Sequence, residues 1–174
     1  MFGDTTTDLI AASIFVALLI AASVVDLVKR RVPNQLVAVL AVGGLVYSAT
    51  GNAGLVASVA GLLLGLLIWI PSWLLRLLGA GDVKLFAASG AWLGPIGALE
   101  AAVWAGIIGG LLSLVWLLRY RGVQGTVLSL SALRVDPKGA IERDRDTFSP
   151  KALPYAIALA AGALIAAWFP RAMF

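Results

Sequence analysis

Residues 29–76 decide the fold, and they read KRRVPNQLVAVLAVGGLVYSATGNAGLVASVAGLLLGLLIWIPSWLLR. Charged side chains occur only at the two ends of this stretch. A membrane crossing takes about 20 predominantly apolar residues, so the stretch is too long for a single crossing. Thr50-Gly51-Asn52 lies in its middle and has the composition of a turn. We therefore predict two membrane helices here, over residues 35–49 and 55–70.

The composition of the whole chain also indicates a membrane protein. Of its 174 residues, 61% are hydrophobic and 13% are charged, whereas a soluble domain is about half apolar and a quarter charged. This composition excludes a soluble globular enzyme. The length leaves room for about six crossings joined by short loops. We expect a single domain over residues 1–174, an all-α bundle of six transmembrane helices in the lipid bilayer.

The remaining spans are the apolar runs between charges, because a charged side chain at the bilayer centre costs at least ~2.5 kcal/mol. The first run follows acidic residues instead of the basic segment of a signal peptide, so we interpret it as a retained span. Pro71 should end or kink the third helix, and Gly94-Pro95 should close the fourth. The expected spans are residues 9–25, 35–49, 55–70, 82–93, 98–118 and 152–169.

The distribution of Lys and Arg predicts the orientation, since cytoplasmic loops carry the excess of these residues. If the N-terminus lies outside, Arg171 is the single basic residue of the thirteen that is not on the cytoplasmic side. Both termini are then non-cytoplasmic, and residues 119–151 form a cytoplasmic loop. Acidic and basic residues alternate in that loop, which favours a solvated segment over a calcium site. The basic residues separate apolar runs, so we expect no nucleic-acid partner.

Cysteine and histidine are both absent. Their absence removes disulfides, thiol nucleophiles, Ser-His-Asp catalysis and the usual zinc sites. We expect no metal and no cofactor. Any chemistry must come from carboxylates, hydroxyls, lysine or arginine.

Two acidic residues, Asp26 and Asp82, lie at the cytoplasmic ends of predicted helices, at the same membrane depth. Each has a structural interpretation when taken alone. Asp26 can pair with Lys29 or Arg30 one turn later, and Asp82 is a good N-cap for the helix that begins there. Taken together, they are what metal-free hydrolysis of a peptide needs. One ionised carboxylate activates water, and its protonated partner polarises the scissile carbonyl.

The segments around these two residues resemble a known family. Gly79-Ala80-Gly81-Asp82-Val83-Lys84 is similar to the G-x-G-D-x-K motif of the type IV prepilin peptidases. Residues 26–34, DLVKRRVPN, resemble the first-aspartate motif of that family, and Pro154-Tyr155 resembles its proline-aromatic element. The resemblance covers nearly the whole chain.

The resemblance implies an intramembrane aspartyl protease of the GXGD type with Asp26 and Asp82 as its catalytic pair. It implies a multi-pass protein of the inner membrane whose active site faces the cytoplasm. The substrate would be a prepilin, with its basic leader and N-terminal hydrophobic helix. The chain lacks the N-terminal domain with paired cysteines of longer members, and so resembles the short form of Flp/Tad pili or the archaeal preflagellin peptidases. On that ground we expect no N-methylation.

Several neighbours are candidate supporting residues. Gly79 and Gly81 would let a substrate backbone approach Asp82 closely. Lys84 either biases the pair toward its singly ionised state or anchors the helix at the cytoplasmic face. After Pro33, Asn34 is expected to cap the second helix rather than to contact substrate.

Two other functions compete with proteolysis. Acidic residues in membranes commonly form proton relays, which would suit a small proton-coupled transporter. Both acids lie at an interface, however, whereas carrier sites usually lie at the midplane. A scaffold subunit of a pilus or secretion machine is the third interpretation.

Overall fold

The computed structural model describes residues 6–29, 32–50, 54–75, 78–135 and 155–168. Its regular elements over these residues are all helices. They are α1 (Thr6–Lys29), α2 (Asn34–Thr50), α3 (Leu55–Leu74), α4 (Ala80–Val135) and α6 (Tyr155–Trp168). The prediction of an all-α fold is confirmed.

Three segments of these helices are long and apolar enough to cross a membrane, namely Thr6–Lys29, Leu55–Leu74 and Ala80–Val115. The helices α2 and α6 are apolar but shorter. Many large apolar side chains point outward on the long helices, for example Val28 with 76% of its surface exposed. Such outward apolar surface is what a bilayer solvates, so we treat the chain as an integral membrane protein.

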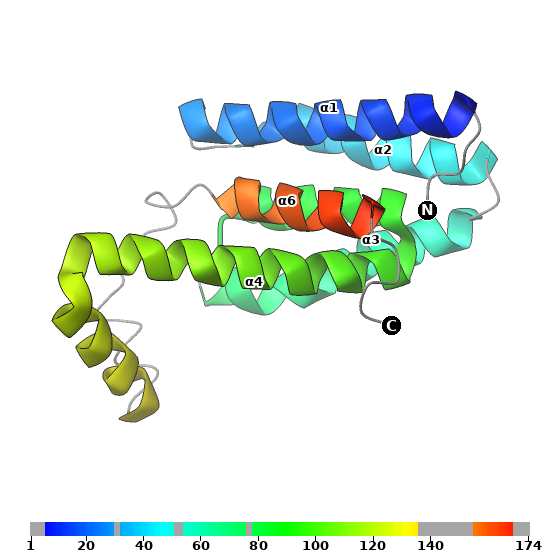
Figure 1. Cartoon of the computed structure of the whole chain (residues 1–174). Coiled ribbons are helices and arrows are strands. Elements are labelled where there is room, and N and C mark those ends of the chain that lie inside the picture. Colours follow the sequence, from blue (N-terminus) through cyan, green and yellow to red (C-terminus); the bar gives the residue numbers. More distant parts are fainter. Residues whose placement is uncertain (1–5, 30–31, 51–53, 76–77, 136–154, 169–174) are drawn as a thin grey trace.

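The described chain contains five helices where six spans were predicted. The difference arises because residues 82–93 and 98–118 belong to one helical run, α4. Gly94 lies within this run at φ 67, a left-handed conformation that glycine adopts without steric cost, and Pro95 follows it. Figure 1 shows α4 reversing direction between its first part, next to α3, and its longer part, next to α6. A single glycine therefore replaces the expected loop.

Two further boundaries differ from the prediction. The helix α3 does not end at Pro71, which was one of the two effects predicted for this proline, and it continues to Leu74. The predicted loop 119–151 is helical as far as Val135, and its remainder lies outside the described residues. The predicted turn at residues 51–52 lies outside them as well.

Small residues let α4 pack closely on both neighbours. An added Cβ atom at Gly61 of α3 would collide with the carbonyl of Gly90 in α4. At Gly162 of α6, it would lie 2.6 Å from the carbonyl oxygen of Ala101. The contacts of α4 with α3 and α6 are the most extensive in the bundle. Lipid supplies no hydrophobic drive between helices, so this close backbone approach is what holds the three together.

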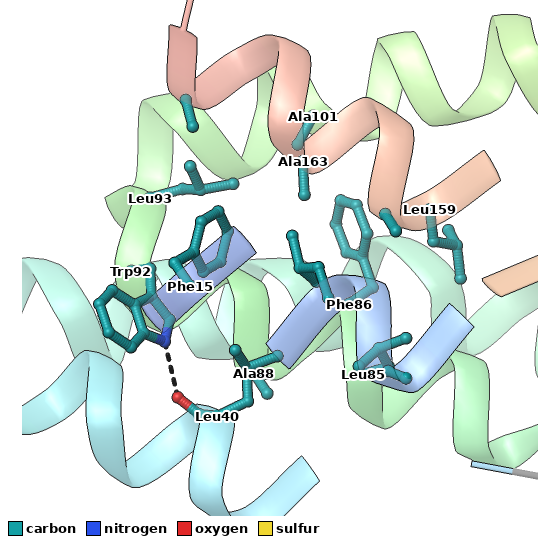
Figure 2. Close-up of a cluster of buried hydrophobic side chains, with 14 of the residues drawn as sticks. Phe15, Leu40, Leu85, Phe86, Ala88, Trp92, Leu93, Ala101, Leu159 and Ala163 are labelled. Carbon is teal, nitrogen blue, oxygen red and sulfur yellow. Dashed lines mark hydrogen bonds between the residues drawn. The ribbon is translucent and has the colours of Figure 1, made fainter. Parts of the chain in front are cut away.

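Trp92 connects this part of the bundle with α1 and α2. Its indole N–H donates a hydrogen bond of 2.7 Å to the carbonyl of Leu40 in α2. Its ring lies 5.3 Å from that of Phe15 in α1 and stacks on Tyr47 of α2 at 5.7 Å. Figure 2 shows Phe15, Trp92 and Leu40 together in the buried core. The helices that carry the two motifs thus share one apolar core.

Candidate active site

Asp26 occupies the buried face of α1. The residues of α1 that face the bundle recur every three or four positions, as Ala11, Phe15, Leu19, Ala22 and then Asp26. Asp26 is 8% exposed, whereas its neighbours Leu27 and Val28 point outward. The carboxylate therefore ends an apolar stripe and lies inside the bundle.

Asp82 is the third residue of α4. The carbonyl of Gly79 accepts hydrogen bonds from the N–H groups of Asp82, at 3.1 Å, and of Val83, at 3.3 Å. Gly79 therefore holds the N-cap position, and the prediction that Asp82 is the N-cap is wrong. The carboxylate of Asp82 instead accepts a hydrogen bond from the N–H of Gly79. This is the reciprocal arrangement of a capping box, in which the third helical side chain reaches back to the cap.

The structure brings the two aspartates together. Asp26 and Asp82 interact electrostatically across the gap between the end of α1 and the start of α4. The backbones beside them are also in contact. A Cβ atom at Gly81 would lie 3.5 Å from Cβ of Val32, which is buried in the segment between α1 and α2. An alanine at position 81 would make ordinary van der Waals contact with Val32, and only a longer side chain would push these two segments apart.

These two juxtaposed segments fall within a stretch that matches a known family. Residues 13–114 match the type IV leader peptidase family. The chain belongs to this family.

Relatives with prepilin-related names match about half of the chain. A prepilin leader peptidase/N-methyltransferase of Aeromonas hydrophila is 39% identical over 93 residues, which are 49% of this chain and 32% of that protein. Its namesake in Burkholderia pseudomallei (strain K96243) is 39% identical over 102 residues, 54% and 33% of the two chains. A protein of Escherichia coli O78:H11, named type 4 prepilin-like proteins leader peptide-processing enzyme, is 36% identical over 103 residues. These residues are 54% of this chain and 38% of that protein. The chain spans about a third of the length of these relatives. No solved structure matches it.

The remaining supporting residues of the two motifs lie at the starts of α2 and α4. The carbonyl of Pro33 accepts hydrogen bonds from the N–H groups of Leu36 and Val37 at 3.1 and 3.3 Å. Pro33 therefore holds the N-cap position of α2. The prediction that Asn34 is the cap is wrong, since Asn34 is the first helical residue and is exposed. Lys84 is exposed near the start of α4.

The proline-aromatic element is described only in part. Pro154 lies outside the described residues, whereas Tyr155 begins α6. A Cβ atom at Gly109 of α4 would come within 2.8 Å of the Tyr155 ring. This aromatic side chain therefore holds the start of α6 against α4, as a packing residue.

The sequence interpretation missed one buried acid among the described residues. Glu100 of α4 is 2% exposed. The signal was visible, because an acid inside an apolar run of a membrane protein is unusual and generally faces the bundle interior. Among the described residues, no three acidic, cysteine or histidine side chains gather as a metal site would require.

Proposed function

We propose that this protein is an intramembrane aspartyl endopeptidase that removes the basic leader from type IV prepilins of the Flp-like kind. The observation that carries the proposal is the juxtaposition of a buried Asp26 with Asp82 across α1 and α4. Membership of the leader peptidase family supports the choice of reaction. The names of the relatives support the choice of substrate.

The reaction needs one proton shared by the two carboxylates. The ionised carboxylate takes a proton from water, and the water oxygen attacks the carbonyl carbon of the scissile peptide bond. The protonated carboxylate gives its proton to the carbonyl oxygen, which yields a tetrahedral diol. When the diol collapses, one of its hydroxyl groups gives its proton to the ionised carboxylate and re-forms the carbonyl. The C–N bond breaks, and the leaving nitrogen takes the proton of the other carboxylate, so that the pair again holds one shared proton.

The neighbouring residues position the pair. The N–H of Gly79 fixes the carboxylate of Asp82, and Gly81 lets the α1–α2 connection lie against the start of α4. Pro33 and Asn34 set where α2 begins. Lys84 is exposed near the start of α4 and adds a positive charge at this end of the helix.

The same proposal fixes the membrane face. Cytoplasmic loops keep the excess of Lys and Arg, which places the pair at the cytoplasmic face of the inner membrane and both termini on the other side. A prepilin leader is basic and cytoplasmic in this scheme, so it meets the acidic pair directly. The hydrophobic helix of the prepilin then extends into the bilayer beside the enzyme.

The test is cleavage of a leader-bearing prepilin by the purified protein in detergent. Asp26→Asn and Asp82→Asn should each lower the cleavage rate by at least ~10²-fold, because an amide cannot exchange the required proton. The double variant should be no worse than either single variant, as expected of residues that act as one unit. Unchanged melting temperatures will show that the fold persists.

Glu100→Gln is the matched control, because it removes another buried carboxylate from α4. We expect it to cleave at the wild-type rate. A proton-coupled transporter would not hydrolyse the prepilin, so cleavage by the purified protein separates the two functions. Near wild-type cleavage by Asp82→Asn would refute the catalytic pair.

A further inference from the structure

A groove separates α1 from α2 in the halves of these helices that lie away from Asp26. Its volume is about 710 Å³, which is within the range of specific ligand sites, about 300–1,000 Å³. Ile10 and Ile14 of α1 form one wall, and Val39, Val42 and Val46 of α2 form the other. All five side chains are exposed, so the groove is open to an occupant from the membrane.

The floor of the groove is preformed. Trp92 forms part of it, and this ring is held by its hydrogen bond to the Leu40 carbonyl and by stacking on Tyr47. A Cβ atom at Gly43 would lie 2.8 Å from Cζ2 of Trp92, so the absence of a side chain there lets the ring sit flush. The Tyr47 hydroxyl donates a hydrogen bond of 2.6 Å to Asp8. The floor therefore offers an occupant a fixed, mainly apolar surface.

The groove and the candidate active site lie along the same two helices. Ile14 and Asp26 lie on the same helix, and the rise between them is about 18 Å at 1.5 Å per residue. The helix α2 forms the second wall and begins at Asn34, directly after the segment that contacts Gly81. An apolar helix in the groove that runs antiparallel to α1 would therefore bring its N-terminal end to the depth of the pair. The residues of the bound helix that occupy the groove would then lie about 12 positions after the end that reaches the pair.

We propose that this groove receives the apolar segment that follows the cleavage site of the leader-bearing substrate, an inference that rests on the proposed function. Docking of an apolar helix face into a hydrophobic groove is a common mode of peptide recognition. The walls carry branched aliphatic side chains with no charge, which matches such a segment. The substrate is also the occupant whose reacting bond must lie at the Asp26 end of these helices.

Filling the groove tests the inference. Val42→Trp places a large ring in the groove, and Leu67→Trp is the control, because both side chains are similarly exposed, at 58% and 64%, and Leu67 lies on α3 outside the groove. Each variant is assayed on a full prepilin and on a short peptide that ends a few residues after the cleavage site. Val42→Trp should raise KM for the full prepilin about fivefold or more with kcat unchanged, as expected when ground-state binding is lost. The short peptide should be cleaved as by the wild type.

Other outcomes overturn the inference. Equal losses on both substrates would show that Val42→Trp acts through the catalytic pair, and no change on either would show that the groove is not used. A photo-crosslinker at Val42 should capture the prepilin within its apolar segment. Capture of a phospholipid or a second copy of the enzyme instead would assign the groove to that occupant. If the wild type cleaves neither substrate, the proposed function fails, and the crosslink to uncleaved prepilin still decides the groove.

Discussion

Gly79 contacts Asp82 in two ways, through its carbonyl at the start of α4 and through its N–H at the carboxylate. A Cβ atom at this position would lie 3.2 Å from Oδ2 of Asp82. We predict that Gly79→Ala displaces this carboxylate and lowers the cleavage rate by roughly 10- to 100-fold, because small misplacements of catalytic groups are costly. The stability cost should be at most about 1 kcal/mol. Steady-state kinetics and thermal melting measure the two effects.

Gly106→Ala is the control for that variant, since an added Cβ atom at Gly106 of α4 would meet open space. Alanine suits a helix better than glycine, so this variant should gain roughly 0.5–1 kcal/mol and keep its activity. Equal activity of the two alanine variants would show that the position of the Asp82 carboxylate is not limiting.

For single residues, the sequence predicted which side chains belong to the candidate site. It predicted their individual roles less well. The motifs placed Asp26 and Asp82 at the ends of helices, and the structure brings the two together. The capping roles of Asp82 and Asn34 were wrong. A helix begins at the carbonyl that accepts the first intrahelical hydrogen bond, and sequence patterns leave that position uncertain by one or two residues.

At the scale of the elements, the contact between α3 and α4 depends on Gly61. We predict that Gly61→Ala forces these helices apart at the Gly90 carbonyl and destabilises the bundle by about 1–3 kcal/mol, the usual cost of overpacking. Gly110→Ala, at a position of α4 with open space around it, should cause no loss. The melting temperatures of the two variants in the same detergent check this. Equal melting temperatures would show that the close approach at Gly61 does not limit stability.

The helix boundaries were predicted well from the sequence where charged residues flank an apolar run. It placed helices within the bounds of α1, α2 and α3 to within a few residues. It also recognised Gly94-Pro95 as a break, but not that a left-handed glycine reverses the chain without a loop. Two runs of helix were consequently counted as separate elements, because the dihedral angles of a single glycine cannot be read from hydropathy.

At the scale of the whole molecule, the orientation of the bundle rests on its basic residues. The chain has no native cysteine, so single cysteines report their location without background. We predict that Thr50→Cys, at the end of α2, reacts with a membrane-impermeant thiol reagent in intact cells. Leu75→Cys, which follows α3, should react only after the membrane is opened. The reverse pattern would place the aspartate pair on the face opposite to a cytoplasmic prepilin leader.

The position of Trp92 also gives the protein an optical signal. Indole emission depends on the polarity and hydrogen bonding around the ring, and this ring touches α1, α2 and the floor of the groove. The chain contains six tryptophans. If the other five are replaced by phenylalanine, the fluorescence of Trp92 reports directly on the groove. A spectral shift on mixing with prepilin would then follow the proposed docking in real time, whereas the carboxylates of Asp26 and Asp82 give no optical signal.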